Sequence, residues 1–395
     1  MVVAGIICEY NPFHLGHFGH IERTRLKLGQ DCAIVCVMSG NFVQRGEPAI
    51  FNKHTRAHAA VLCGADLVIE LPTPYAMSSA ERFARGGIYI LDSLGVCDVI
   101  SFGSENGNVE PLFEAAEAIV SDEVNVQIVK WLGKGLPYAA AQQKAADSVL
   151  GEVSAVFKTP NNLLGIEYIK AIVHYKSEMR PITVPRTGGE HDSDTGFSAS
   201  RLRRMLLGGH EPWENMPGYS VDLCKKEIAY GRGPVHMQNL ELAMLSRLRA
   251  IKDFSALSDA TEGLDRRFAR YAASAPTITQ MLDGIKTKRY AMSRIRRMLM
   301  CACLGIVSQD VDEPPPYIKV LAMNRVGMKL LNRARKQSSL PIITKPASVH
   351  KLSGRAVSLF NKEAAATDFY ALSYSEVSNR KGGGEYLQSP IIINA

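Results

Sequence analysis

Short apolar runs and amphipathic stretches alternate along the first half of the chain. The apolar runs are typical of parallel strands buried on both faces, and they cover residues 2–7, 32–38, 67–71, 99–102 and 182–184. Helical spacing separates them, from near residue 14 onward and at residues 53–63, 81–94, 111–150 and 163–175. Strands that alternate with helices in this way predict an α/β fold with a doubly wound, Rossmann-like parallel sheet.

The pattern changes after residue 207. A segment rich in glycine and proline, at 208–212, marks a boundary, and helical spacing then dominates at 240–251, 262–273, 278–286 and 293–304. Two short apolar runs, 317–321 and 340–344, predict strands, and we expect the glycine-rich tail after Lys381 to be loosely packed. We therefore predict one domain at residues 1–207 and a second, mainly helical domain at residues 208–395.

Composition narrows the class of protein. The chain has 395 residues, of which 46% are hydrophobic, and no stretch approaches the ~18 uninterrupted apolar residues of a membrane span. Its start has no basic segment of the kind found in signal peptides. The eight cysteines form no C-x-x-C pair and lie mostly in apolar runs, which is typical of buried thiols in a reducing compartment. We expect a cytoplasmic protein with no membrane contact, and nothing indicates an obligate protein partner.

Basic residues are unevenly distributed, although the net charge is only +7. Residues 286–297 contain six Lys or Arg residues and no acidic residue, and a second basic run covers residues 325–336. Such faces often contact nucleic-acid phosphates, but a solvated helix face has the same composition. The candidates for nucleic-acid contact in the first run are Arg294, Arg296 and Arg297.

The first candidate site lies at the turn between the first strand and the first helix. Asn11 and Pro12 end the strand, and His14 and His17 then fall on one face of the first helical turn. A helix start attracts anions, and Gly16 lets a ligand approach the backbone, so the segment predicts a phosphate site. The same histidines could also be ordinary polar residues on a surface helix, or a chance metal cluster. The H-E-x-x-H zinc pattern is absent, so we expect no metal ligands.

His-x-Gly-His at this position is the signature of the nucleotidyltransferase superfamily, which includes class I aminoacyl-tRNA synthetases and small adenylyltransferases. A second signature of small adenylyltransferases is similar to residues 198–203, where Ser198, Ser200 and Arg203 take the matching places. Backbone N–H groups, hydroxyls and a guanidinium at a helix start can hold the outer phosphates of ATP. A serine N-cap on a basic helix is the simpler interpretation of this segment alone. The two segments together, about 180 residues apart and in the expected order, favour a nucleotide site.

Nearly the whole chain resembles the bacterial tRNA(Met) cytidine acetate ligase family. The matching segments are EYNPFHLGH at 9–17, SGNFVQRGEPAIFNK at 39–53, GADLVIELP at 64–72, FGSE at 102–105, PNNLLGIEY at 160–168, SASRLR at 198–203, SRIRRML at 293–299 and YIKVLAMNRVG at 317–327. The resemblance implies an AMP-forming ligase that uses ATP to activate acetate as acetyl-adenylate. The acetyl group would then pass to N4 of the wobble cytidine of elongator tRNA(Met), forming N4-acetylcytidine.

The resemblance also implies site residues. The family's ATP loop matches Ile7, Cys8, Glu9, Tyr10, Asn11, Pro12, Phe13, His14, Leu15, Gly16, His17, Phe18, Gly19 and His20. Further nucleotide contacts would come from Gly103, Asn161, Asn162 and Arg186. We assign His14 and His17 to the α-phosphate, and Ser198, Ser200 and Arg203 to the β- and γ-phosphates, with Mg²⁺ accompanying ATP. The tRNA would contact Arg294, Arg296 and Arg297.

Two other functions remain open at this point. An adenylyltransferase acting on a small phosphorylated metabolite would carry both nucleotide motifs, but the basic, helical second half of the chain would have no role. A non-catalytic RNA-binding protein could keep the fold alone, although both histidines and the SASRLR segment are present.

Overall fold

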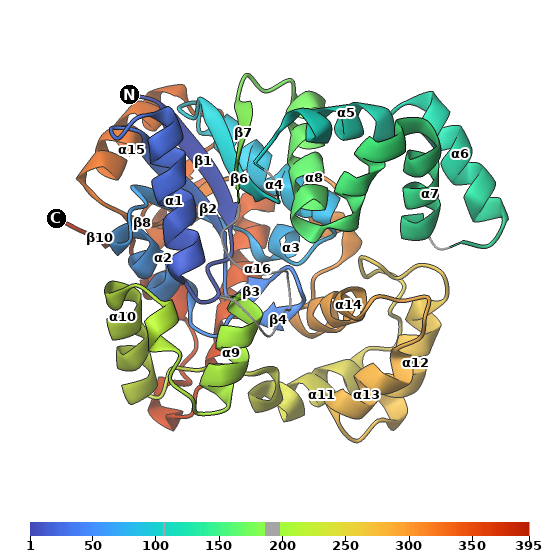
Figure 1. Cartoon of the computed structure of the whole chain (residues 1–395). Coiled ribbons are helices and arrows are strands. Elements are labelled where there is room, and N and C mark those ends of the chain that lie inside the picture. Colours follow the sequence, from blue (N-terminus) through green and yellow to red (C-terminus); the bar gives the residue numbers. More distant parts are fainter. Residues whose placement is uncertain (106, 137, 186–197, 395) are drawn as a thin grey trace.

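A computed structural model describes residues 1–105, 107–136, 138–185 and 198–394, and its centre is one twisted sheet (Figure 1). Seven strands lie in the order β10-β8-β5-β2-β1-β6-β7, and β9 pairs with β8 at one edge. Their bounds are Val3–Cys8 (β1), Ala33–Ser39 (β2), Leu67–Leu71 (β5), Val99–Ser104 (β6), Arg180–Pro185 (β7), Ile318–Met323 (β8), Ile342–Ile343 (β9) and Ile391–Ile392 (β10).

The strand order reverses at β1. The chain adds β2 and β5 on one side of β1 and β6 and β7 on the other, all in parallel, with Gly5 beside Val35 on β2 and Ile100 on β6. Only β8, among the described strands of this sheet, joins its neighbour β5 in the antiparallel direction. The predicted α/β fold with a mostly parallel sheet is therefore confirmed. In such sheets ligands bind at the carboxyl edge where the order reverses, here between β1 and β6.

Helices cover both faces of the sheet because successive side chains of a buried strand point to opposite sides. Ile34, Cys36 and Met38 of β2 pack on the side of helices α1 (Leu15–Leu28) and α2 (Lys53–Leu62). Val35 and Val37 pack on the other side, in the core that includes α4 (Ala80–Ser93), α8 (Pro160–Tyr175) and α15 (Arg325–Gln337). The sheet is thus doubly wound, as the alternating pattern predicts.

The expected helical stretch at 111–150 forms α5 (Glu110–Ile119), α6 (Asp122–Gly133) and α7 (Tyr138–Leu150). Helix α5 packs on α8, while α6 and α7 project from the sheet (Figure 1). Near the carboxyl edge, the chain makes a small hairpin of β3 (Phe42–Val43) and β4 (Glu47–Pro48) and the short helix α3 (Thr73–Ala76). These segments surround the part of the edge where a ligand would bind.

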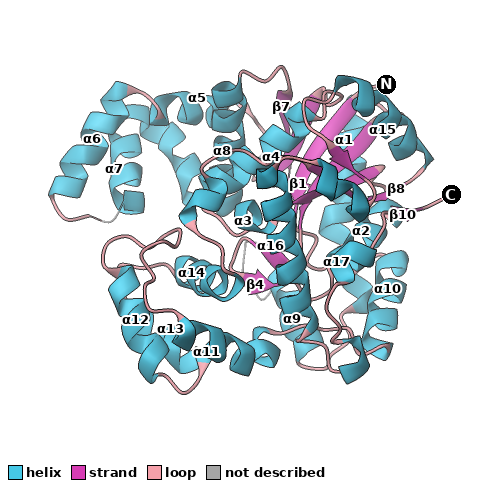
Figure 2. Ribbon diagram, turned by 180° about the vertical axis from the view of Figure 1, so that it is seen from behind, coloured by secondary structure: helices cyan, strands magenta, loops and turns pink. Residues whose placement is uncertain are grey.

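Residues beyond 207 are mainly helical, as predicted. Four helices share a core that includes Leu248, Phe268, Met281 and Leu299: α11 (Glu241–Ala250), α12 (Leu264–Ser274), α13 (Ile278–Ile285) and α14 (Met292–Leu304). Helices α9 (Ala199–Leu207) and α10 (Gly218–Ala229) precede them. The long helix α16 (Gly354–Ala371) runs between this group and the sheet (Figure 2), because Phe360 packs in the sheet core and Phe369 in the helical core.

The C-terminal part of the chain returns to the sheet through β8, β9 and β10. The division at residue 207 stays a prediction. In the structure, three strands from the predicted second domain extend the sheet of the first domain. The expectation of a loosely packed tail after Lys381 is wrong. Residues after Lys381 form α17 (Gly384–Leu387) and β10, and Glu385 is 1% exposed.

Glu385 is buried because it belongs to a charged cluster. The Nζ atom of Lys53 lies 2.6 Å from a carboxylate oxygen of Glu70 and 2.8 Å from one of Glu385. Lys319 of β8 contacts the same two carboxylates, at 3.0 Å from Glu70, its register partner on β5. All four side chains are at most 3% exposed. This cluster fastens the C-terminal tail to the sheet.

None of the helices in the described ranges is long and apolar enough to cross a membrane.

Candidate active site

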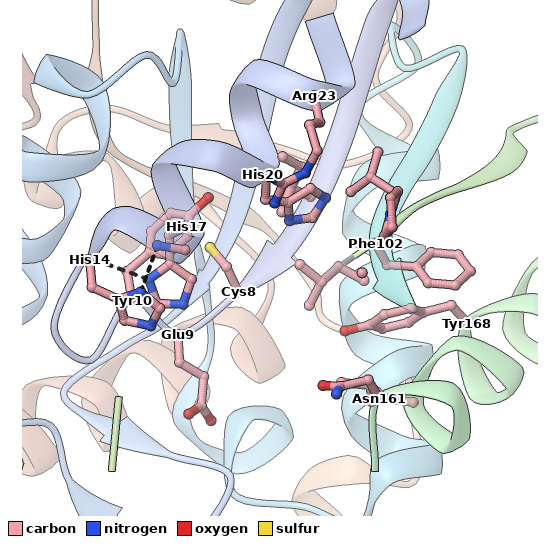
Figure 3. A pocket seen from close by; sticks show the side chains of 17 residues that line it. Cys8, Glu9, Tyr10, His14, His17, His20, Arg23, Phe102, Asn161 and Tyr168 are labelled. Carbon is pink, nitrogen blue, oxygen red and sulfur yellow. Dashed lines mark hydrogen bonds between the residues drawn. The ribbon is translucent and has the colours of Figure 1, made fainter. Parts of the chain in front are cut away.

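A cavity of about 180 Å³ lies at the carboxyl edge between β1 and β6, where the strand order reverses (Figure 3). Its lining comes from β1 and the following turn, from α1, β6 and α8, and from the end of β7. The lining residues are Ile6, Ile7, Cys8, Glu9, Tyr10, His14, Gly16, His17, His20, Arg23, Phe102, Gly103, Asn161, Leu164, Tyr168, Val184 and Pro185. Segments up to about 180 residues apart in sequence therefore meet at one place.

The two histidines form the start of α1. His14 is the N-cap, and its Nδ1 accepts a hydrogen bond of 3.0 Å from the backbone N–H of Gly16. Nδ1 of His17 accepts one of 3.3 Å from the backbone N–H of His14, and the two rings stack with centroids 3.8 Å apart. A Cβ at Gly16 would lie 2.8 Å from Cε1 of His14, so the glycine leaves room for this ring. Since each Nδ1 is an acceptor, a neutral ring carries its proton on Nε2 and can donate it to a phosphate.

A buried tyrosine supports His17. Tyr10 has φ of +46°, a left-handed conformation that is uncommon for a tyrosine. Its ring packs edge-on against His17 at 4.9 Å and against Phe13 at 4.7 Å. Beside it, burial raises the pKa of the Cys8 thiol well above its usual value. Cys8 therefore lines the cavity as a neutral thiol.

The opposite wall is aromatic. Phe102 of β6 and Tyr168 of α8 lie with ring centroids 5.5 Å apart, facing His14 and His17 across the cavity (Figure 3). The ring of Phe102 fits against α8 because residue 165 is glycine, where a Cβ would come within 2.6 Å of it. Flat apolar walls of this kind suit a nucleobase, since aromatic rings stack on its faces. The aromatic wall is therefore suited to the base of a nucleotide whose phosphates lie at the histidine pair.

Most of the ATP loop expected from the sequence lies at this cavity. Its lining includes Ile7, Cys8, Glu9, Tyr10, His14, Gly16, His17 and His20, and it does not include Asn11, Pro12, Phe13, Leu15, Phe18 or Gly19. Asn11 lines the larger cavity described below. His20 lies one turn further along α1 than His17, and its Nε2 is 3.0 Å from Oγ of Ser101 on β6. The residues outside the lining shape the turn: Phe13 is buried, while Leu15 and Phe18 are partly exposed.

The three other nucleotide candidates that the structure describes divide into two groups. Gly103 and Asn161 line the cavity, and the Asn161 amide donates a 2.9 Å hydrogen bond to Glu105. Asn162 is 6% exposed, and its side-chain oxygen accepts from the backbone N–H of Glu105 at 3.5 Å, so it supports the loop after β6. Arg186 lies outside the described residues.

Sequence reasoning missed Arg23, Phe102 and Tyr168, which also line the cavity. The spacing of Arg23, three residues after His20 on α1, could have revealed it as a member of the same helix face. Phe102 and Tyr168 have no such signal, because an aromatic residue in a strand or an apolar helix face resembles any core residue.

A larger cavity of about 660 Å³ continues from the first and shares His14, His17, Asn161 and Tyr168 with it. The start of α9 lines it with Ser198, Ala199, Ser200 and Arg203, so the structure brings the two sequence signatures together. Ser198 is the N-cap of α9 and accepts from the N–H of Arg201 at 3.2 Å. Arg203 donates to the carbonyl of Asn11 at 2.9 Å, which ties α9 to the turn before α1.

The three candidate tRNA-contacting arginines belong to the first turns of α14. Arg296 and Arg297 line the larger cavity, while Arg294 is outside that lining. Each has an acidic partner in the protein: Glu262 lies 2.7 Å from Arg294, Glu47 forms an ion pair with Arg296, and Asp259 lies 3.0 Å from Arg297. Their role in tRNA binding stays a prediction.

Over the ranges that the structure describes, no three His, Cys, Asp or Glu side chains form a group that could hold a metal ion. The described residues of the larger cavity include one carboxylate, that of Glu9. The arrangement as a whole offers histidine N–H groups, a helix start, serine hydroxyls and a guanidinium around one space, which is the chemistry of a polyphosphate site.

Comparisons with known proteins agree with this geometry. The profile of the HIGH Nucleotidyl Transferase family matches residues 1–385. The tRNA(Met) cytidine acetate ligase of Acetivibrio thermocellus is 37% identical, covering all of both chains, and that of Caldanaerobacter subterraneus is 38% identical over 96% of this chain and 98% of its own. The crystal structure of Thermotoga maritima TmcAL bound with alpha-thio ATP superposes with a TM-score of 0.92 at 31% identity, over the full length of both chains. The chain therefore belongs to the HIGH nucleotidyl transferase family and, within it, to the tRNA(Met) cytidine acetate ligases.

Proposed function

We propose that this protein activates acetate with ATP as acetyl-adenylate and transfers the acetyl group to N4 of the wobble cytidine of elongator tRNA(Met). The observation that carries the proposal is the meeting of the stacked pair His14 and His17 with the Ser198–Arg203 segment around one space. Full-length relatives named for this reaction, and a solved relative bound to an ATP analogue, support it.

In the first half-reaction, acetate attacks the α-phosphorus of ATP and pyrophosphate leaves. The aromatic cavity would hold adenosine, which brings the α-phosphate to the start of α1. There, Nε2–H groups of His14 and His17 would donate to the oxygens on which charge develops. Ser198, Ser200 and Arg203 would hold the β- and γ-phosphates that become pyrophosphate. The protein's contribution is positioning and charge stabilisation, as in other reactions at phosphorus.

ATP enters such reactions as its magnesium complex. Mg²⁺ in proteins is usually held by substrate phosphates, water and one or two carboxylates. Glu9 is placed to be that carboxylate, because it lines both cavities beside the histidine pair. One of its oxygens accepts from the N–H of Gln44 at 2.8 Å. The position of the Glu9 carboxylate therefore fits a magnesium–ATP substrate.

In the second half-reaction, the cytidine amine attacks the acetyl carbon. The N4–C bond forms as the bond from the acetyl carbon to the AMP oxygen breaks. AMP leaves with that electron pair, and one amine proton is released to solvent. Activation is needed because free acetate has no good leaving group and the amine lone pair is delocalised into the ring. The target base must leave its stack to reach the adenylate.

Because its substrate is a tRNA, the protein would act in the cytoplasm. The candidates for contact with the tRNA are Arg294, Arg296 and Arg297 in the basic first turns of α14. Acetate-dependent exchange of pyrophosphate into ATP, measured without RNA, tests the first half-reaction. We expect exchange that requires acetate, and acetylation of cytidine once tRNA(Met) is added. Exchange that ignores acetate but requires a phosphorylated metabolite would overturn the proposal in favour of a small-metabolite adenylyltransferase.

A further inference from the structure

We infer that the larger cavity is an acceptor chamber, in which a flipped-out pyrimidine nucleotide of the RNA lies between the β3–β4 hairpin and the first turns of α14, and that Gln44 recognises its base. The inference rests on the proposed function and specifies where the second substrate binds. It would make one site from two parts of the chain that are about 250 residues apart.

The two cavities divide the reaction in space. The smaller one, about 180 Å³, has the aromatic wall that suits adenine, and the larger one, about 660 Å³, extends from the same histidine pair toward α14. Binding sites for small organic ligands usually measure ~300–1,000 Å³, so the larger cavity has room for a further nucleotide beside the acetyl-adenylate. An acetyl group carried on AMP at His14 and His17 would therefore face the larger cavity.

The wall of the larger cavity fits a single nucleotide. Val43, Gln44 and Arg45 of the hairpin line one side, and Met292, Ser293, Arg296 and Arg297 of α14 line another. Met292 supplies apolar surface on which a base can rest, while guanidinium groups attract the RNA phosphates that flank it. Apolar surface beside cations is the combination that single-stranded nucleic-acid sites use.

Gln44 is the candidate for reading the base. A carboxamide offers both a donor and an acceptor, and cytosine carries two acceptors, N3 and O2, next to its amine. A glutamine N–H donated to N3 or O2 would hold the ring and leave the N4 amine to attack. The backbone N–H of Gln44 already donates to Glu9 at 2.8 Å, so this residue is fixed relative to the ATP loop.

The two sides of the chamber are held at a fixed separation. Gly46, at φ of +74°, lies so close to α14 that a Cβ there would be 2.2 Å from the backbone nitrogen of Arg297. Glu47 of the hairpin forms an ion pair with Arg296, and Asp259 holds Arg297 through Nε at 3.2 Å and Nη2 at 3.0 Å. The hairpin thus joins the helical group to the ATP loop, and the chamber is preorganised.

The test compares the two half-reactions in Gln44→Ala, which removes the amide and keeps the backbone N–H that Glu9 accepts. The readout is the ratio of the single-turnover rate of acetyl transfer to tRNA(Met) over the rate of acetate-dependent pyrophosphate exchange. We expect this ratio to fall at least ~10-fold, the scale of one lost hydrogen bond to the substrate. Gln280→Ala is the matched control. It removes the amide of an exposed glutamine on α13, outside the lining of the chamber, and should leave both rates unchanged.

Gln44→Glu separates recognition from space filling. It keeps the size of the side chain but replaces the amide donor with a carboxylate, which repels the acceptor edge of cytosine. We expect its ratio to be as low as that of Gln44→Ala. A normal ratio in either variant, or an equal fall in exchange and transfer, would overturn the inference. Wild-type protein without acetate-dependent exchange would instead contradict the proposed function, so the two failures are distinguishable.

Discussion

Two groups of polar side chains lie near the same edge of the sheet, with opposite consequences. After β1, His14 and His17 line the two cavities. At β5 and β8, Glu70 and Lys319 are fully buried and contact Lys53 and Glu385, so each charge has its counter-charge within the protein. A polar residue at this edge of the sheet therefore does not by itself indicate a binding site. Here the two histidines face the cavities where the strand order reverses, whereas the charges of the cluster are matched by other side chains of the protein.

Energetics separate the two groups further. Transfer of a charge from water into the protein interior is costly unless the charge is paired, so the charged cluster is stable only as a whole. The Lys53 and Lys319 charges lower the pKa of Glu70 to about 2 against the opposing effect of burial, which keeps this carboxylate ionised. Substitutions in the two groups should therefore differ in what they damage.

The largest expected effect is on stability. Lys319→Met keeps the length of the side chain but leaves Glu70 and Glu385 with one counter-charge fewer in a buried place. Removal of one partner of a buried ion pair typically costs ~3–5 kcal/mol. Urea unfolding should show a loss of that size, whereas Lys336→Met, at an exposed position of α15, should cost little. A loss below ~1 kcal/mol would mean that the cluster is not a unit of stability.

The next effect is on catalysis. His17→Ala should slow acetate-dependent pyrophosphate exchange by about 100-fold, the scale of one preorganised donor lost from a transition state. Its unfolding free energy should fall by only ~1–2 kcal/mol, because the ring makes one cap hydrogen bond and packs against the rings of His14 and Tyr10. His210→Ala, at an exposed position, is the control. Normal exchange in His17→Ala would remove this histidine from the mechanism.

His14→Asn sharpens the same distinction between structure and chemistry. Asparagine is one of the best N-cap residues, so it can accept from the first turn of α1 as His14 does, but it has no ring N–H at the same reach. We expect unchanged stability in urea and exchange slowed by about 100-fold. Exchange near the wild-type rate would show that His14 serves only as a cap.

A smaller effect is expected from pH. Burial, together with the nearby charge of Glu70, raises the pKa of Glu363 to about 7. The folded protein therefore holds this proton at pH values where the unfolded chain has lost it. The resulting stability is complete below the unfolded pKa of about 4.5 and is lost as the pH rises to about 7.

Glu363→Gln tests this linkage, because the amide stays neutral and can still pair with Thr73. The amide oxygen can accept from the Thr73 N–H, which lies 2.6 Å from one carboxyl oxygen, and the amide NH2 can donate to the Thr73 hydroxyl, which lies 2.8 Å from the other. Between pH 5 and 7, the unfolding free energy of the wild type should fall relative to that of the variant by an amount on the order of 2 kcal/mol. Parallel pH profiles for the two proteins would contradict the raised pKa.

The smallest effect concerns the arginines of α14. Replacement of Arg296 or Arg297, which line the larger cavity, should weaken tRNA binding and reduce its salt dependence by about one phosphate contact each. Arg294→Ala should change both less, because Glu262 and the side chain of Thr261 hold its guanidinium outside that lining. Equal effects of all three on the slope of binding against salt would indicate a uniform phosphate-binding face.

Much of the site is encoded locally. The apolar run of β1, the turn at Asn11 and Pro12, and histidines three residues apart specify a strand, a turn and a capped helix from contacts within about 20 residues. The order of strands and helices likewise predicts the doubly wound sheet, because each parallel strand needs a helical crossover. The H-x-G-H and SASRLR segments, and with them the resemblance to the ligase family, can be recognised from the sequence because each is a short run of neighbouring residues.

Only the tertiary structure decided which residues meet. That Glu385 lies 2.8 Å from Lys53, that Gly46 touches α14, and that Asn161 lines a cavity while Asn162 does not, all depend on contacts between distant segments. The antiparallel return of β8 to the sheet has the same origin, since the short run at 317–321 does not specify its partner. Local pattern determines which elements form, whereas burial and charge pairing, satisfied over the whole chain, determine where they lie.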